Sequence, residues 1–230
     1  MLATLAGALV LCAQTPAAVD HTGETMLKEA FAKSGEIRQS RLIVFKMNRT
    51  AGGLYLQDST LDIWLGGPNQ VRIESMSTMG DSTVTVMDGP VTMTDPLSDD
   101  EPIHLKKSSP NLEEMSPREP LLWFLAGAPA YDRVVDTTKA IKLLESGDAV
   151  EFRTKTFGKI VIGCSPSGLP TRIETYQSGR RRDAGTESEF AVTVERIQVM
   201  EYGAISRSLF SVTPAKGRKV EDERTKPPSP

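Results

Sequence analysis

Apolar and polar residues alternate with a period of two over most of the chain after Arg41. In the stretch TLDIWL, for example, Leu61, Ile63 and Leu65 share one face and Asp62 lies on the other. One-sided strands of this kind are typical of antiparallel sheets with one face on a core and the other in water. The same alternation recurs in segments 71–74, 84–86, 150–155, 169–174 and 189–195, while in segment 42–45, LIVF, the two residues on each face are apolar.

Turn-forming residues, such as Asp88-Gly89 and Ser178-Gly179, separate these alternating runs. Many short strands without long intervening helices predict a barrel or a strongly curved sheet. Under this pattern the strand carboxylates Glu151, Glu174 and Glu195 are expected to point outward into water.

A helical period predicts two helices. The first spans Thr22 to Gly35, where an apolar stripe that includes Leu27 and Phe31 should pack on the sheet. The second is expected from Pro117 to Ala126, after a capping box at residues 116–119 and with proline at the first helical position. Its residues 121–125, LLWFL, are apolar nearly all round, and such a helix must be buried.

Residues 95–120 interrupt the strand pattern with prolines at 96, 102, 110, 117 and 120. A long proline-rich loop inside a compact domain is usually functional or mobile. We expect this loop to let the second helix move without unravelling a strand. The charged, proline-rich tail, residues 218–230, is expected to be disordered.

The chain's 230 residues are 39% hydrophobic and 25% charged, which fits one domain of residues 19–217 plus short extras. The apolar run from Leu2 to Ala13 is too short to span a bilayer and is followed by small residues. We therefore predict a signal peptide, residues 1–18, and a location in the periplasm or cell envelope. Lipidation at Cys12 is disfavoured because Leu11 stands where a small residue is wanted.

No pattern of catalytic residues is recognisable, so we expect a non-enzymatic protein without cofactor. His21 and His104 are expected in loops, and neither has cysteine, histidine or paired carboxylates at metal-ligand spacing. A net charge of -3 and the lack of a basic stripe argue against nucleic acid. The cluster 180–182, RRR, could make transient membrane contact, although a solvated turn is the preferred interpretation. Cys164 is interpreted as a small buried hydrophobe.

Several motifs, in order along the chain, resemble those of the LolA-type lipoprotein carriers. Residues 62–69, DIWLGGPN, are similar to the family's aromatic strand and its "RPN" turn, and residues 86–89, VMDG, to the "SDG" hairpin. Residues 168–170, GLP, resemble the "G-x-P" turn, and residues 208–217 with 220–222 resemble the closing motif. One departure concerns Gly67, which stands where the carriers have an arginine tied to opening and closing of the lid.

The resemblance implies a mainly β (α+β) fold: a half-open, strongly curved antiparallel barrel with an N-terminal helix and a central helical lid around an apolar cavity. It also implies that the cavity takes a lipid or the acyl chains of a lipoprotein. The same fold serves in LolB-type acceptors and RseB-type regulators, so a sensing or structural module that binds an envelope protein partner is the alternative. The expected lipid-binding residues are Leu61, Ile63, Leu65, Val84, Val86, Leu121, Leu122, Trp123, Phe124 and Leu125.

Overall fold

The computed structural model describes residues 22–37, 39–49, 55–67, 69–108, 111–115, 119–156, 158–180, 187–201 and 205–224. The expected signal peptide, Cys12, His21, Arg181 and Arg182 lie outside these ranges. The elements are α1 (Gly23–Glu36), β1 (Ser40–Arg49), β2 (Tyr55–Gly67), β3 (Gln70–Ser77), β4 (Ser82–Asp88), β5 (Val91–Asp95), β6 (Ile103–Lys107), α2 (Leu112–Met115), α3 (Pro120–Leu125), α4 (Ala128–Val134), β7 (Lys142–Leu143), β8 (Ala149–Arg153), β9 (Lys159–Cys164), β10 (Pro170–Arg180), β11 (Glu187–Glu201), the 3-10 helix η1 (Arg207–Phe210) and β12 (Val220–Asp222).

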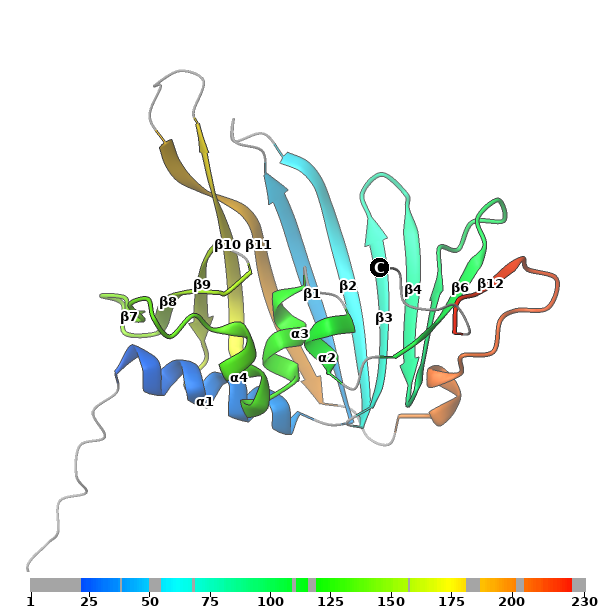
Figure 1. Cartoon of the computed structure of the whole chain (residues 1–230), viewed down its shortest axis with the longest axis horizontal. Helices are drawn as coiled ribbons and strands as arrows, with labels where there is room; N and C mark the ends of the chain where they lie inside the picture. The colour runs from blue at the N-terminus through cyan, green and yellow to red at the C-terminus, as the bar shows by residue number, and fades with distance from the viewer. Residues whose placement is uncertain are drawn as a thin grey trace, which may run out of the picture.

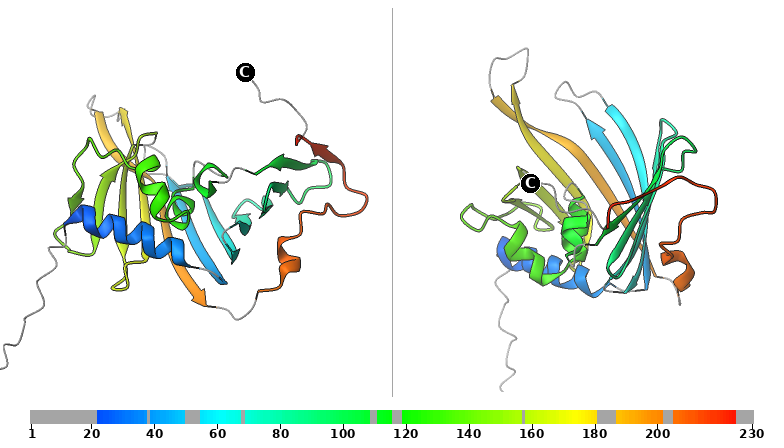
Figure 2. Two further views of the ribbon diagram at one scale, coloured as in Figure 1. Left: turned by 60° about the horizontal axis from the view of Figure 1, so that its bottom comes forward. Right: turned by 45° about the vertical axis from the view of Figure 1, so that its right-hand side comes forward.

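All twelve strands of the described residues form one sheet, in the order β12-β6-β5-β4-β3-β2-β1-β11-β10-β9-β8-β7. Neighbouring strands are antiparallel except β12, which runs parallel to β6. The sheet is strongly curved but does not close, and the helices lie on its concave side (Figures 1 and 2). The predicted half-open antiparallel barrel with an N-terminal helix is therefore confirmed.

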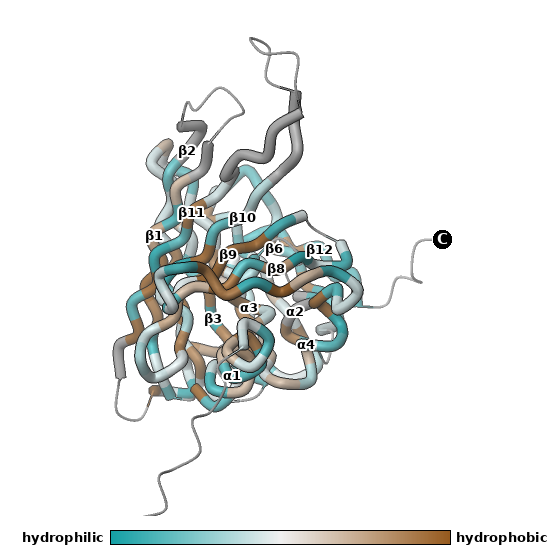
Figure 3. Tube along the Cα trace, turned by 90° about the vertical axis from the view of Figure 1, so that its left-hand side faces the viewer, coloured by the Kyte–Doolittle hydropathy of each residue, from teal (hydrophilic) through white to brown (hydrophobic). Residues whose placement is uncertain are grey.

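Strand register gives the sheet two distinct faces. The inner face, which the helices cover, carries the buried Leu42, Val44 and Ile63, since Leu42 pairs with Ile63 across β1 and β2. The outer face carries Arg41, which pairs with Trp64. Figure 3 shows hydrophobic and hydrophilic residues following one another along the strands, as expected for side chains that alternate between two faces.

The first helix forms as its sequence predicts. Thr22 caps α1 by accepting a hydrogen bond from the backbone N–H of Thr25, and the buried Leu27 and Phe31 face the core. The second predicted helix begins three residues later than expected. Glu119 is the N-cap of α3 and Pro120, not Pro117, occupies the first turn, while residues 116–118 lie outside the described ranges. No helix in the described part of the chain is long and apolar enough to cross a membrane.

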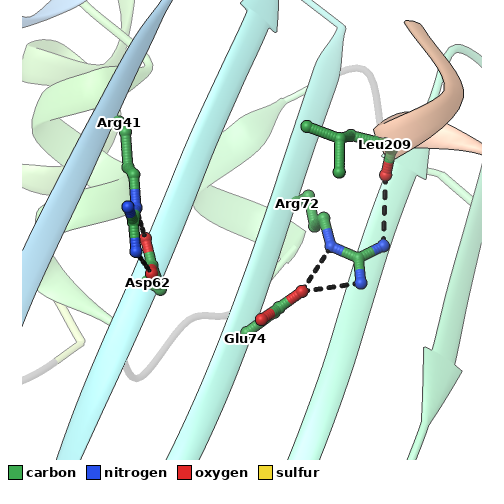
Figure 4. A network of polar contacts seen from close by, with 5 residues as sticks. All are labelled: Arg41, Asp62, Arg72, Glu74 and Leu209. Atoms are coloured by element: carbon green, nitrogen blue, oxygen red, sulfur yellow. Dashed lines mark hydrogen bonds and ion pairs between the residues drawn. The ribbon is translucent and has the colours of Figure 1, made fainter. Parts of the chain in front are cut away.

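Residues 205–224, here called the C-terminal strap, begin over the outer face of β3–β6 and end as β12 on the edge of β6. The buried Phe210 packs there in an outer core with Val84, Val86, Met93, Ile103 and Leu105. In the right-hand view of Figure 2 the strap lies on the side of the strands away from the helices. Figure 4 shows one of its attachments, in which Arg72 donates to the backbone oxygen of Leu209 at 3.1 Å.

The structure differs from the expected disorder of the tail over residues 218–224. Val220–Asp222 form β12 on the edge of β6, and Arg218 donates to the backbone oxygens of Ser98 and Glu101. The segment 95–120 also differs from a loop, because it contains β6 and α2. Composition predicted disorder for the tail and a mobile loop for residues 95–120, yet pairing of β6 with both β5 and β12 gives each segment regular structure.

Candidate functional site

The short helix α3 fills the concave side of the sheet. Its residues Leu121–Leu125 are each at most 3% exposed. They belong to the hydrophobic cluster on the concave side of the sheet, here called the inner core, together with residues of α1, α4 and strands such as β1, β2, β8 and β9. The ring of Phe124 lies 4.4 Å from that of Phe31 on α1 and 6.4 Å from that of Phe152 on β8, centroid to centroid. The burial predicted from its all-round apolar surface is confirmed.

Local backbone geometry lets α3 come this close. Gly127 ends the helix with a φ of +82°, a left-handed conformation that glycine adopts without strain. The backbone of Gly127 touches Gly35 at the end of α1, where an added Cβ on Gly35 would lie 2.5 Å from the Cα of Gly127. The junction of α3 and α4 is thus packed backbone against backbone on α1.

Eight of the ten predicted site residues meet in the inner core: Leu61, Ile63 and Leu65 on β2 with Leu121–Leu125 on α3. Val84 and Val86 do not join them. The register of β3 and β4 places Val86 opposite Arg72, which itself pairs with Trp64 on the outer face. These two valines contact the outer core under the strap, so their expected position beside the helix is corrected.

A buried ion cluster ties the start of α3 to the inner face. Lys46 Nζ on β1 donates to both carboxylate oxygens of Glu119, the N-cap residue of α3, at 2.8 Å. The same ammonium lies 3.6 Å from Oε1 of Glu195 on β11, whose side chain is 1% exposed. The side chain of Lys46 is 13% exposed and that of Glu119 is 25% exposed, so Glu195 is withdrawn from water while Glu119 is partly exposed.

Burial raises the pKa of Glu195 to about 7, against the lowering effect of Lys46 and with a further rise from Glu119. Burial pulls the pKa of Lys46 down, but the charges of Glu195 and Glu119 outweigh it and leave that pKa raised. Lys46 therefore stays protonated near neutral pH, while Glu195 titrates there. The cluster holds a cation between two carboxylates, one of which is poorly satisfied, since neither oxygen of Glu195 accepts a hydrogen bond.

Two of the three strand carboxylates expected in water are buried. Glu195 faces inward because it pairs with Lys46, and Glu174 is 9% exposed on the outer face, where it accepts a hydrogen bond from the Tyr176 hydroxyl. The sequence gives only a weak signal for the cluster: Lys46 shares a face with Leu42 and Val44 at a spacing of two, but the other face of this strand is apolar as well. A charge in that place needs a partner.

The outer face carries a polar hollow of about 490 Å³ over β8, β9 and β10. Glu151, Lys159, Arg172, Glu174 and Tyr176 line it, with Lys159 Nζ 4.2 Å from the centre of the Tyr176 ring. Its charged groups neutralise one another, as in the pair of Lys159 and Glu151 at 3.7 Å. Cys164 also reaches this hollow, and burial raises the pKa of its thiol to about 11, which makes it an unreactive group.

Gly66 and Gly67, at the end of β2, have opposite tolerances for a side chain. A Cβ on Gly66 would lie 2.4 Å from the Phe210 ring, whereas a Cβ on Gly67 meets nothing closer than Gln70 Oε1 at 4.0 Å. Gly67 also has no positive φ. Glycine at 67 is therefore not a backbone requirement, although the carriers' arginine is missing there.

We expect Gly67→Arg to change the free energy of unfolding by no more than about 0.5 kcal/mol, as an open surface position does. Gly66→Ala, its matched control, is expected to lose about 1–3 kcal/mol because the strap must shift to admit the methyl group. Urea unfolding of both variants measures the difference. A large loss in Gly67→Arg, or none in Gly66→Ala, would contradict this geometry.

No family model and no curated protein matches the chain. Solved structures similar to it include MucB, at 14% identity and a TM-score of 0.44, with 86% of this chain and 65% of that chain covered. The chain thus spans slightly less than two thirds of MucB. A LolA superfamily protein from Nitrosomonas europaea shows 12% identity and a TM-score of 0.38, with 83% and 97% covered. A DUF1329 family protein from Desulfovibrio piger shows 10% identity and a TM-score of 0.38, with 82% and 95% covered.

Identities this low and TM-scores below 0.5 give no information about the ligand or partner of this chain. The sequence motifs resemble those of LolA-type carriers, and a LolA superfamily protein is among these similar structures. What the chain does must therefore be inferred from its own inner core, ion cluster and strap.

Proposed function

We propose that the inner face of the sheet holds an acyl chain of a lipid or lipoprotein, with α3 as a movable lid, and that the protein acts in the periplasm or cell envelope without catalysis. One observation carries the proposal. A six-residue helix, apolar on every side, sits inside a half-open sheet and is no part of the strand framework.

The free energy of burying apolar surface favours an apolar ligand at the inner face of the sheet. The inner core around α3 offers Leu61, Ile63 and Leu65 from β2, and each methylene moved from water against such a surface contributes about 0.8 kcal/mol. A chain of about ten methylenes therefore gains several kcal/mol even after ordering costs. No polar recognition is needed, which suits a surface built from leucine, isoleucine and phenylalanine.

The contact between Lys46 and Glu119 supplies a latch for the lid. It joins the N-cap of α3 to a strand through side chains, so α3 can leave its seat without breaking the sheet. A ligand that binds the open state must overcome the free energy that holds the lid closed. Weakening the latch should then raise the apparent affinity for an acyl ligand.

We expect Glu119→Gln to bind a long-chain fatty acid more tightly than the unaltered protein, by about threefold to tenfold, the equivalent of losing one partly exposed ion pair of about 1 kcal/mol. Delipidated full-length protein would be titrated with oleic acid by calorimetry. Glu24→Gln is the control, because Glu24 pairs with Lys28 on the exposed side of α1. Binding to neither protein, or weaker binding to Glu119→Gln, would contradict the lid proposal.

The alternative function, docking of a protein partner, is favoured by a separate feature. A groove of about 290 Å³ crosses β1, β2 and β3, and two of the residues that line it, Phe45 and Met76, are 50% and 65% exposed. If no acyl ligand binds, α3 is a permanent part of the core, and this groove is the docking surface for a protein partner.

A further inference from the structure

The C-terminal strap ends beside a histidine that no sequence spacing connects with it. Strand β12 runs parallel to β6 and places Glu221 opposite His104. The pairing continues one step further, because the backbone N–H of Glu223 donates to the oxygen of Leu105 at 2.8 Å. Glu221 and Glu223 are two residues apart on an extended segment, so both side chains lie on the face that His104 occupies.

These three side chains converge on one point. Nδ1 of His104 lies 3.6 Å from Oε2 of Glu221 and 3.7 Å from Oε1 of Glu223. One ligand atom from each residue can be chosen so that all lie within 4.8 Å of one another. Both distances exceed the range of about 2.7–3.2 Å for an N–H···O hydrogen bond. Two ligands of a tetrahedral zinc ion, each about 2.0–2.2 Å from the metal, lie about 3.3–3.6 Å apart.

We propose that His104, Glu221 and Glu223 bind a divalent transition-metal cation, best represented by Zn²⁺, which fastens the C-terminal strap to the sheet. One imidazole and two carboxylates suit zinc, because magnesium and calcium prefer oxygen ligands alone. The side chains of His104, Glu221 and Glu223 are 34%, 42% and 30% exposed, so water can complete the coordination.

The cation would act on the fold because its ligands come from two distant segments. His104 belongs to the sheet, and both glutamates belong to the strap that closes the outer core over Val86 and Leu105. A cation bound by all three favours the docked strap over the free one. Lys106 competes with such a cation, because its Nζ lies 3.7 Å from Oε2 of Glu223, but its side chain is 59% exposed and can move away.

The test uses the full chain and zinc chloride as the probe. We expect zinc to bind one site by calorimetry and to raise the melting temperature. His104→Ala and Glu221→Gln should each weaken binding by about tenfold or more, since even groups behind the ligands of a metal site change affinity about 10–100-fold. Lys106→Ala, the matched control on the same strand, should bind zinc as tightly as the unaltered protein or more tightly.

A second readout reports the strap itself. Zinc should slow tryptic cleavage after Lys216 and Lys219 in the unaltered protein and in Lys106→Ala, but not in Glu221→Gln. Glu221→Gln keeps the test informative if His104→Ala fails to fold, because Glu221 is partly exposed on an edge strand. Absence of zinc binding, or equal affinity in Glu221→Gln and the unaltered protein, overturns the proposal.

Discussion

Lys46→Met is expected to destabilise the protein by about 1–2 kcal/mol at pH 8, because keeping Glu195 protonated in the variant costs about 1.4 kcal/mol for each pH unit above its folded pKa of about 7. Lys46 Nζ lies 3.6 Å from Glu195 Oε1, and without it a carboxylate that is 1% exposed loses this compensating charge. Methionine has a similar length and no charge, so the loss reports the uncompensated carboxylate more than a change in packing.

The pH dependence of this loss follows from the pKa of Glu195. Its pKa in the folded protein is about 7, above the ordinary 4.5, so the folded state holds the proton more tightly than the unfolded state. The contribution of Glu195 to stability is therefore fully present below about pH 4.5 and is lost as the pH rises to about 7. Lys46 lowers that pKa, so in Lys46→Met the decline should continue beyond pH 7.

Urea unfolding between pH 5 and pH 9 measures both effects. Glu195→Gln should be more stable than the unaltered protein at pH 8 and nearly equal to it at pH 5. The double variant Lys46→Met/Glu195→Gln should regain most of the stability that Lys46→Met loses at pH 8. A loss in Lys46→Met that is the same at pH 5 and pH 8 would show that the ion cluster is not its cause.

Phe124→Ala is expected to lose about 3–5 kcal/mol, because it empties the centre of the inner core. Phe124 is fully buried, and its ring meets Phe31 from α1 and Phe152 from β8, so three elements lose contact at once. The loss should appear as a lower urea midpoint with an unchanged slope.

Phe45→Ala is the matched control, since the same ring is removed where it is 50% exposed. It should lose no more than about 1 kcal/mol, as exposed positions do. If Phe124→Ala were as mild as Phe45→Ala, α3 would be loosely seated, and its burial would contribute little to the stability of the fold.

Periodicity was sufficient to predict most of the sheet and α1, because one face of β1–β3 is covered by helices and the other meets water over much of its area. The prediction from periodicity failed at β4, where both faces of the sheet are covered. Val84 and Val86 have the pattern of an inner face, yet the strap covers the outer face there and places them in a second core. A two-residue period shows that residues share a face but not which face.

The ion cluster and the group around His104 could not be predicted from the sequence for a different reason. Lys46 and Glu195 are opposite each other only because β1 pairs with β11, which are about 150 residues apart in the sequence. His104 meets Glu221 through a parallel edge pairing that follows no short spacing rule. Local patterns predicted the elements, whereas long-range pairing brings these polar groups together.

The central claim is that an acyl chain enters the inner face against α3, and contact quenching tests it most directly. The chain has two tryptophans: Trp123 in the inner core and Trp64 on the outer face, 5.0 Å from the Arg41 guanidinium. Delipidated Trp64→Phe and Trp123→Phe proteins would be titrated with stearic acid and with its dibrominated analogue, whose bromines quench indole fluorescence on contact. We expect the brominated chain to quench the fluorescence of Trp123 and to leave that of Trp64 unchanged. Equal emission of Trp123 with both acids at saturating concentration, or quenching of Trp64 alone, would contradict it.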